Sequence, residues 1–300
     1  MTQVPHFGRV LTAMITPFTV NGELDVNEAV KLAKWLQEQG NDGLVVTGTT
    51  GEASTLTDAE KIALWEAVAQ AVTIPVIAGS ASNDTAHSVH LTKKATEVGA
   101  AGILAVGPYY NRPPQSGIAA HMGAIASATH LPVVLYDIPV RTGRKIATAN
   151  LLTLANDHSN IVALKDAAGN PAETASVIAQ APQGIQVYSG DDGLTLPLLS
   201  VGAMGVIGVA THWSAPEHQL MMKAFFAGNT AEAQRVNALL LASYAFETGD
   251  DSPNPLPSKE MMKLHGFAVG DARLPMGPAA SWVAERAAVV KKNLEATRTR

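Results

Sequence analysis

The chain has 300 residues, of which 47% are hydrophobic and 16% are charged, so it can bury a large core and is not a disordered tail. Its net charge is −5 at pH 7 and it has no block of basic residues, which argues against nucleic acid and anionic membranes as partners. The absence of cysteine excludes disulfide bonds and thiolate metal sites. No stretch approaches the roughly 20 apolar residues of a membrane span, so we expect a cytoplasmic protein.

Short apolar runs rich in β-branched residues alternate with longer helical patterns from the start of the chain. These runs are almost wholly apolar, as strands buried on both faces of a parallel sheet should be. The predicted strands are Val10–Thr16, Gly43–Thr47, Pro75–Gly79, Gly102–Gly107, Pro132–Tyr136, Ile161–Lys165, Ile185–Ser189 and Gly205–Val209.

Helix start signals fall between the predicted strands. Three pairs have the spacing of a capping box, in which a side chain accepts from a backbone N–H three residues on. A fourth signal combines a cap, a first-turn proline and a glutamate. These signals are Asp25 with Glu28, Thr57 with Glu60, Ser214 with Glu217, and Asn170-Pro171 with Glu173.

Eight strands that alternate with helices up to Ala227 predict an α/β fold, the closed (β/α)8 barrel known as the TIM barrel. An open doubly wound sheet would alternate too, but no strand is followed by the glycine fingerprint of dinucleotide binding. The pattern beyond Gly228 is helical, with segments at Ala231–Glu247, Ser258–Leu264 and Ala279–Ala296. We therefore expect a catalytic barrel over residues 1–227 and a C-terminal helical appendage over residues 228–300.

Lys165 is the sharpest chemical signal. Active sites of such barrels lie where strands end, and Lys165 alone among the lysines extends a buried apolar strand. Burial lowers the pKa of an amine, and a neutral amine can attack a carbonyl and form a Schiff base. The alternative is a lysine paired with Asp166 or another acid. Tyrosines and threonines at neighbouring strand ends favour the nucleophile.

Other strand ends offer partners for such a lysine. Tyr136 could move protons, or could be a core tyrosine with a satisfied hydroxyl. Thr49 and Thr50 stand between two glycines and could hold a carboxylate, or form an ordinary turn. Arg141 presents a fork suited to a carboxylate, with a surface salt bridge as the alternative.

The remaining polar residues give no sign of a metal or a cofactor. His87 and His90 share a predicted helix face without a convincing third ligand, so a solvated face is the better interpretation. Ser189-Gly190-Asp191-Asp192 lies where many barrels bind phosphate, but two aspartates would repel a phosphate. The pair Tyr109-Tyr110 is interpreted as loop packing at a subunit interface, from which a tyrosine can also reach a neighbour's site.

These motifs together resemble the dihydrodipicolinate synthase (4-hydroxy-tetrahydrodipicolinate synthase) family, within the superfamily of N-acetylneuraminate lyase and the class I aldolases. The resemblance covers nearly the whole chain. The matching segments are Gly48-Thr49-Thr50-Gly51-Glu52, Pro108-Tyr109-Tyr110-Asn111, Tyr136-Asp137-Ile138-Pro139, Arg141-Thr142-Gly143, Lys165-Asp166, Ser189-Gly190-Asp191-Asp192, Gly205-Val206-Ile207, Asn254-Pro255-Leu256-Pro257, Lys259 and Arg273-Leu274-Pro275.

The resemblance implies a lyase without cofactor or metal. It would condense pyruvate with L-aspartate 4-semialdehyde to 4-hydroxy-tetrahydrodipicolinate, on the pathway to diaminopimelate and lysine. Lys165 would form the imine with pyruvate. Thr49, Tyr136 and Tyr110 would form a proton relay, with Tyr110 entering from the neighbouring subunit of a homotetramer, a dimer of dimers.

The remaining implied contacts are with the substrate carboxylates and the pocket walls. Thr49 and Thr50 would hold the carboxylate of pyruvate, and Arg141 that of the semialdehyde. The backbone carbonyls of Gly190 and Ile207 would line the pocket. Gly208, after Ile207, departs from the family pattern, in which a serine is common.

The implied effector site also departs from the family pattern. Where lysine-inhibited members carry histidines, this chain has Asp58 and Lys61, and His87 replaces a glutamate that would bind the effector's ammonium group. Asn83 and Tyr109 are kept. We therefore expect weak or absent inhibition by lysine.

Two alternatives remain at this point. The first is a related 2-oxo acid lyase, such as N-acetylneuraminate lyase or a 2-keto-3-deoxy sugar-acid aldolase or dehydratase. Arg141 argues against it, because those enzymes generally lack an arginine in this loop. The second is a catalytically silent barrel used for binding, since a fold alone does not establish activity. The intact set of lysine, tyrosines and threonines argues against a silent barrel.

Overall fold

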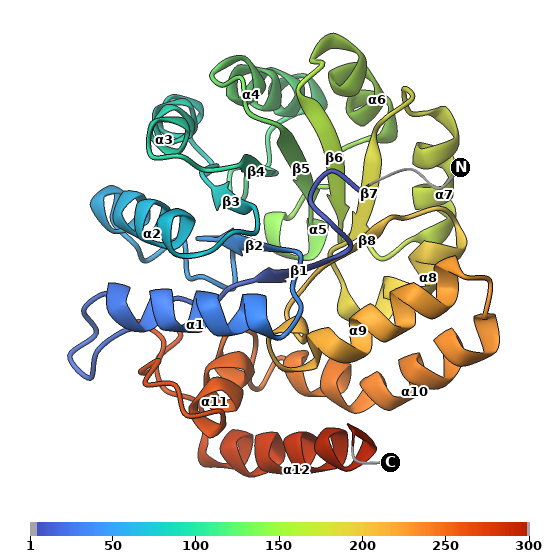
Figure 1. The fold of residues 1–300 in the computed structure, drawn as a ribbon. Helices are drawn as coiled ribbons and strands as arrows, with labels where there is room; N and C mark the ends of the chain where they lie inside the picture. Colours follow the sequence, from blue (N-terminus) through green and yellow to red (C-terminus); the bar gives the residue numbers. More distant parts are fainter. Residues whose placement is uncertain (1–4, 299–300) are drawn as a thin grey trace.

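The computed structural model describes residues 5–298 as a closed barrel of eight parallel strands, enclosed by helices (Figure 1). Neighbours in sequence are neighbours in the sheet, and β8 pairs with β1 to close it. The strands are β1 (Val10–Ala13), β2 (Gly43–Val46), β3 (Val76–Gly79), β4 (Gly102–Val106), β5 (Val133–Asp137), β6 (Ile161–Asp166), β7 (Gln186–Ser189) and β8 (Gly205–Gly208). The predicted barrel and its eight strands are confirmed, with shifts of a few residues at the ends.

Helices follow the strands around the outside of the barrel. They are α1 (Val26–Glu38), α2 (Asp58–Ala71), α3 (Thr85–Glu97), α4 (Gln115–Ser127), the short α5 (Pro139–Thr142), α6 (Thr148–Asp157), α7 (Pro171–Gln180), α8 (Thr195–Ser200) after the 3-10 turn η1 (Asp192–Leu194), and α9 (Thr211–Phe226). None of the helices described is long and apolar enough to cross a membrane.

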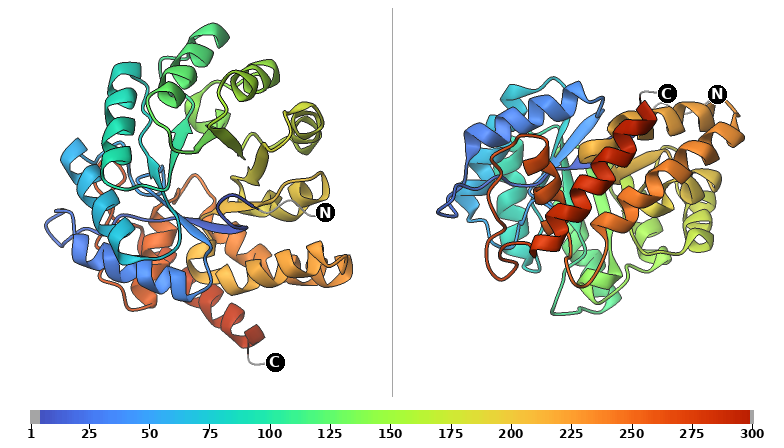
Figure 2. Two further views of the ribbon diagram at one scale, coloured as in Figure 1. Left: turned by 45° about the horizontal axis from the view of Figure 1, so that its top comes forward. Right: turned by 90° about the horizontal axis from the view of Figure 1, so that it is seen from below.

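Three further helices lie on one side of the barrel, next to α1 and α9 (Figure 2). They are α10 (Thr230–Glu247), α11 (Leu256–Leu264) and α12 (Ser281–Arg298), which confirms the predicted helical C-terminal region. The segment between α10 and α11 runs back to the barrel mouth, where it lines a cavity. The division of the chain at residue 227 stays a prediction.

Three of the four predicted helix starts are confirmed. Thr57 and Glu60 form a complete capping box at α2. The side chains of Asp25 and Asn170 accept from the backbone N–H groups three residues on, at the starts of α1 and α7.

The predicted start at Ser214 is wrong. The helix already begins at Thr211, and the backbone of Ser214 departs from helical geometry inside it. The Ser214 hydroxyl donates to the carbonyl of Ala210, and the Glu217 carboxylate pairs with Arg298 instead of capping. Pro216 accounts for the distortion, because its ring lacks an N–H for the carbonyl one turn earlier.

Alternation along β5 and β6 decides which side chains face the barrel interior. Successive residues of a strand point to opposite faces, and Tyr136 is level with Lys165 in the paired strands. Tyr136 and Ala163 belong to the cluster that fills the barrel, so Lys165, two residues after Ala163, points inward as well. Their neighbours Asp137 and Asp166 point outward.

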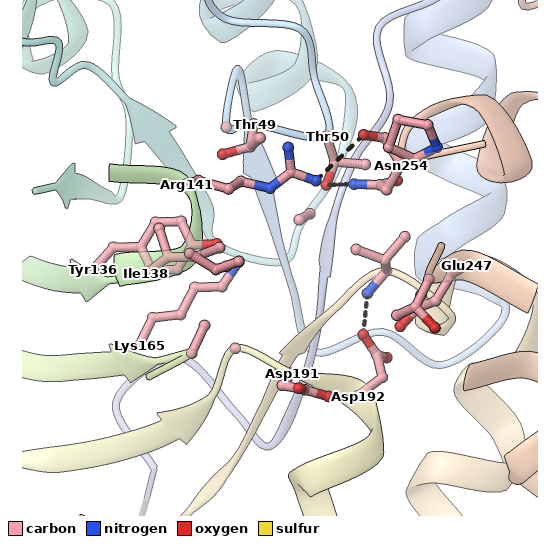
Figure 3. Close-up of a pocket in the computed structure, with 18 of the residues that line it drawn as sticks. Thr49, Thr50, Tyr136, Ile138, Arg141, Lys165, Asp191, Asp192, Glu247 and Asn254 are labelled. Atoms are coloured by element: carbon pink, nitrogen blue, oxygen red, sulfur yellow. Dashed lines mark hydrogen bonds between the residues drawn. The ribbon is translucent and has the colours of Figure 1, made fainter. Parts of the chain in front are cut away.

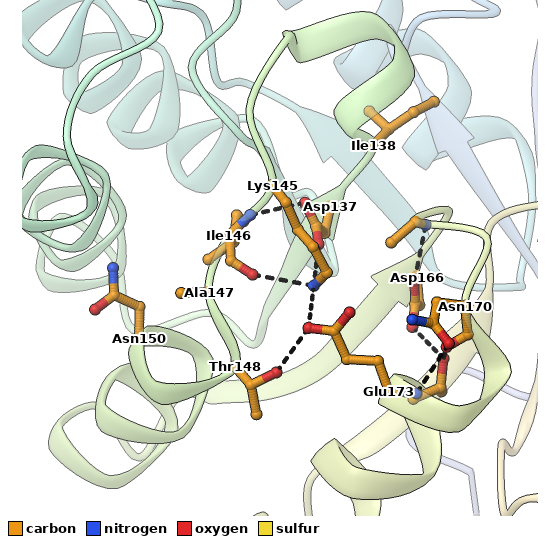
Figure 4. Close-up of polar contacts among 12 residues, drawn as sticks. Asp137, Ile138, Lys145, Ile146, Ala147, Thr148, Asn150, Asp166, Asn170 and Glu173 are labelled. Atoms are coloured by element: carbon orange, nitrogen blue, oxygen red, sulfur yellow. Dashed lines mark hydrogen bonds and ion pairs between the residues drawn. The ribbon is translucent and has the colours of Figure 1, made fainter.

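The outward carboxylates hold the loops that follow these strands (Figure 4). Asp137 accepts from the backbone N–H of Ile146 and from Lys145 Nζ, each at 3.1 Å, and Lys145 also pairs with Glu173. Asp166 accepts from the hydroxyl of Thr174 at 2.6 Å. Because Asp137 and Ile146 bracket the loop after β5, their contact fixes the segment that carries Arg141.

Candidate active site

A cavity of about 380 Å³ lies at the carboxyl ends of the strands (Figure 3). Its walls come from the loops after β2, β5, β6 and β7 and from residues 247–254 of the C-terminal region. It therefore brings together the strand ends that the sequence singled out with a segment of the C-terminal region.

Lys165 lies at the base of this cavity, with 4% of its surface exposed. Burial lowers the pKa of its amine to about 8, while the nearby Asp192 opposes the shift. No carboxylate of residues 5–298 comes within ion-pair distance of Lys165 Nζ, and Asp166 faces the other way, toward Thr174. The alternative of a Lys165–Asp166 ion pair is therefore wrong, and the amine is free to react.

Tyr136 lies beside the amine, with Lys165 Nζ 4.3 Å from the centre of its ring. Its hydroxyl is hydrogen-bonded to the side chain of Thr49, and burial raises its pKa. The tyrosine thus joins the loop that carries Thr49 and Thr50, called the threonine loop below, to the lysine. It remains protonated at neutral pH.

The threonine loop is held from the C-terminal region. The side-chain amide of Asn254 donates to the hydroxyl of Thr50 at 2.8 Å. Glu52, in a left-handed conformation with φ of 55°, forms a buried ion pair of 2.7 Å with Lys259 of α11. The carboxylate of Glu52 also accepts from the backbone N–H of Arg273. These contacts hold a backbone conformation that is costly for a residue with a side chain.

Arg141 follows Pro139 in the short helix α5 and faces the cavity (Figure 3). Its guanidinium group donates to the backbone carbonyl of Asn254 at 3.5 Å. No described carboxylate pairs with it, so the alternative of a surface salt bridge is wrong. An exposed guanidinium group without an acid partner at a cavity mouth is suited to binding a carboxylate ligand.

Of the two predicted wall residues, Gly190 lines the cavity and Ile207 does not. A Cβ atom at Gly190 would lie 3.0 Å from Lys165 Cγ, so glycine leaves room for the lysine side chain. Ile207 is fully buried within β8, and Val209 lines the cavity in its vicinity. The contact predicted for the carbonyl of Ile207 stays a prediction.

Three acidic residues on the cavity wall complete the site. Asp191 and Asp192 follow β7, and Glu247 is the last residue of α10. Sequence reasoning considered the two aspartates only as an obstacle to phosphate, and it missed Glu247. The end of an ordinary helix gives no local signal that its glutamate is buried, since the partners of Glu247 are Asp192 of η1 and the backbone of Ala210, which follows β8.

A second cavity, of about 330 Å³, shares Thr49, Tyr136 and Arg141 with the first. It is also lined by Lys61, Tyr109 and Tyr110, whereas Asn83 and His87 stand outside it.

Neighbouring contacts fix the predicted effector residues. His87 Nε2 lies 2.8 Å from a carboxylate oxygen of Asp58, and Tyr109 is hydrogen-bonded to the backbone of Asn83. Tyr110 is 90% exposed and has a positive φ of 71°.

Residues 5–298 contain no group of three or more histidine or acidic side chains arranged to hold a metal ion. The reactive groups that line the cavity include the amine of Lys165, the hydroxyl groups of Thr49, Thr50 and Tyr136, and the guanidinium group of Arg141.

Comparison with known proteins settles the family. A model of the dihydrodipicolinate synthetase family matches residues 6–295. This chain belongs to that family. The 4-hydroxy-tetrahydrodipicolinate synthase of Moorella thermoacetica is 46% identical over 273 residues, which are 90% of this chain and 92% of the relative.

Solved structures of the dihydrodipicolinate synthetase family share the fold along nearly the whole chain. The dihydrodipicolinate synthase of Bacillus anthracis superposes with a TM-score of 0.92 at 42% identity, covering 95% of this chain and 98% of that one. The enzyme of Cyanidioschyzon merolae, solved with lysine bound, has a TM-score of 0.93 at 41% identity, covering 96% and 98%.

Proposed function

We propose that this chain condenses pyruvate with L-aspartate 4-semialdehyde to 4-hydroxy-tetrahydrodipicolinate, in the biosynthesis of diaminopimelate and lysine. The observation that carries the proposal is the buried, unpaired amine of Lys165 below a cavity that also holds the unpaired Arg141. The names of the similar proteins support the same reaction. We place the reaction in the cytoplasm.

The reaction begins with the amine of Lys165. It attacks the keto carbon of pyruvate, water leaves, and an imine forms. Loss of a proton from the methyl group gives an enamine, whose carbon attacks the aldehyde. The amino group of the second substrate then attacks the imine carbon, which releases Lys165 and closes the ring.

Protons for these steps move through hydroxyl groups. Tyr136 is close enough to the amine to exchange a proton during imine formation. Its hydrogen bond to Thr49 provides a path for that proton away from Lys165. The third member of the relay is Tyr110 from a neighbouring subunit of a tetramer. Its exposure of 90% in the single chain supports a place at a subunit interface.

The two carboxylates are held at different places. Thr49 and Thr50 bind the carboxylate of pyruvate near Tyr136, and the guanidinium group of Arg141 binds that of the semialdehyde. A short aldehyde that carries a carboxylate fits this charge better than a neutral sugar such as N-acetylmannosamine does.

A coupled assay tests the function. Pyruvate and aspartate semialdehyde are supplied with a dihydrodipicolinate reductase, and loss of NADPH is followed. A parallel sample receives pyruvate with N-acetylmannosamine and is assayed for sialic acid. NADPH loss that requires both substrates and the protein supports the proposal. No loss with an active reductase contradicts it, and sialic acid in the second sample would replace it with the lyase.

Imine formation should accelerate as pH rises through about 8. Because burial lowers the pKa of Lys165 from 10.5 to about 8, the neutral amine becomes the major form above that pH. Well below it, the rate should fall about tenfold per pH unit. The measurement is the second-order rate of trapping with pyruvate and cyanoborohydride between pH 6 and about 10. A midpoint near 10.5 would contradict the buried amine.

Lysine should inhibit the enzyme weakly or not at all. The ammonium group of Lys61 lies in the second cavity and repels a cationic effector, and His87 is engaged with Asp58. We expect activity to persist as L-lysine rises to millimolar concentrations. Loss of most activity at modest lysine would show that the cavity accepts it despite Lys61.

A further inference from the structure

Glu247 and Asp192 form a buried carboxyl pair on the cavity wall (Figure 3). They are 5% and 2% exposed, and their side chains are hydrogen-bonded to each other. In the described part of the chain, Glu247 Oε2 and Asp192 Oδ1 have no other hydrogen-bond partner, and Asp192 Oδ1 lies 3.7 Å from Nε2 of His218. Two carboxyl groups can share a hydrogen bond only when one of them carries a proton. The pair therefore holds a proton, and its members are not both ionised.

The proton belongs to Glu247. Both side chains accept from a backbone N–H, Asp192 from Val209 at 2.8 Å and Glu247 from Ala210. Burial and the adjacent Asp192 raise the pKa of Glu247 well above its ordinary value. Glu247 therefore donates the hydrogen bond that Asp192 accepts.

Gly208 gives this pair its space. A Cβ atom at position 208 would lie 2.9 Å from Asp192 Cγ and closer still to Oδ1. Any side chain there would displace the Asp192 carboxylate. The glycine that departs from the family pattern is thus explained by the carboxyl pair, although Gly208, Asp192 and Glu247 lie on three different elements.

Several titratable groups surround the pair. They are Lys165 of β6, Asp191 beside Asp192, Tyr244 of α10, His212 and His218 of α9, and Arg141 across the cavity.

The two histidines among these groups are neutral. His218 Nδ1 bonds to the carbonyl of Ser214, His212 Nδ1 bonds to that of Val209, and burial lowers the pKa of both rings. Lys165 is thus the catalytic group that responds most directly to the charge of the pair.

We propose that Glu247 is a positioning residue, which holds the proton that it shares with Asp192 so that the pair presents one negative charge to Lys165. Two charges would hold Lys165 as an ammonium ion and slow its attack. No charge would leave the positive imine nitrogen uncompensated. This inference rests on the proposed imine on Lys165.

The test is the pH midpoint of imine trapping with pyruvate and cyanoborohydride, measured at low pyruvate. Glu247→Gln removes an ionisable group but keeps a hydrogen-bond donor for Asp192. Its midpoint should equal that of the unsubstituted protein. Adding Asp192→Asn to Glu247→Gln removes the single charge, so the midpoint should fall by roughly one pH unit. Asp250→Asn, at an exposed position on the same cavity, is the matched control and should leave the midpoint in place because solvent screens it.

The midpoints of the two variants can each overturn the inference. A drop of about one pH unit in Glu247→Gln alone would mean that Glu247 is ionised, and the inference would be wrong. An unchanged midpoint in the double variant would overturn it as well, because no charge would act on Lys165. Thermal unfolding checks each fold, and if the double variant does not fold, Glu247→Gln alone decides. Absence of trapping in the unsubstituted protein would overturn the proposed imine and this inference together, whereas trapping with the wrong midpoints would overturn only the inference.

Discussion

Replacing Lys165 by alanine should abolish covalent trapping of pyruvate and lower kcat/KM by more than about 10³-fold. The reason is chemical, since no other amine lies at the base of the catalytic cavity in the described residues. Alanine fits the site without strain, because Lys165 occupies an ordinary strand position level with Tyr136. The measurement is the mass of the protein after reduction with borohydride, together with the coupled assay.

Lys61→Ala is the matched control for this experiment. Lys61 is also buried, at 6% exposure, and it lines the adjacent cavity. The Lys61→Ala protein should still gain the mass of one reduced pyruvate. If trapping survived in Lys165→Ala and disappeared in Lys61→Ala, the nucleophile would be Lys61 in the second cavity, and the assignment of Lys165 would be wrong.

Replacing Arg141 by alanine should separate the two substrates. Pyruvate trapping should be retained, because Arg141 contacts neither Lys165 nor the threonine loop through a side-chain hydrogen bond. Use of the semialdehyde should suffer, with kcat/KM falling about 10²-fold, which corresponds to roughly 3 kcal/mol for a charged two-pronged contact.

Arg144→Ala controls for the loss of positive charge in the same loop, because Arg144 does not line the cavity. Steady-state kinetics with each substrate varied in turn give the comparison. If semialdehyde kinetics were unchanged in Arg141→Ala, that carboxylate would bind elsewhere. If Arg144→Ala lost as much, the effect would come from long-range charge and not from contact.

Local patterns were sufficient to predict most of the barrel. Strands buried on both faces are continuous apolar runs, and that signal survives in a single sequence because burial dictates residue type. The same reasoning located Lys165, because a charged residue that ends such a run stands out against it. Burial is the main cause of its lowered pKa, and the positive charge of Arg141 lowers the pKa further.

Long-range packing accounts for what the sequence did not reveal. Glu247 ends an ordinary helix, and its partners are Asp192 and the backbone of Ala210, which lie far from it along the chain. Gly208 could be noted as a departure but not explained, because the atom it accommodates belongs to Asp192. At Ser214, spacing matched a capping box, yet the preceding residues were already helical. The cases of Glu247 and Gly208 turn on contacts between distant segments, which spacing does not encode, whereas the case of Ser214 is local.

The alternation in β5 and β6 has a consequence for how this gene can change. In each strand, an inward reactive residue is followed directly by an outward carboxylate. These neighbours are Tyr136 and Asp137 in β5, and Lys165 and Asp166 in β6. Loss of a single codon within either strand would turn a carboxylate into the barrel and the reactive side chain out toward the helices. We therefore expect that the enzyme tolerates substitutions and insertions in its loops, but not insertions or deletions within β5 and β6.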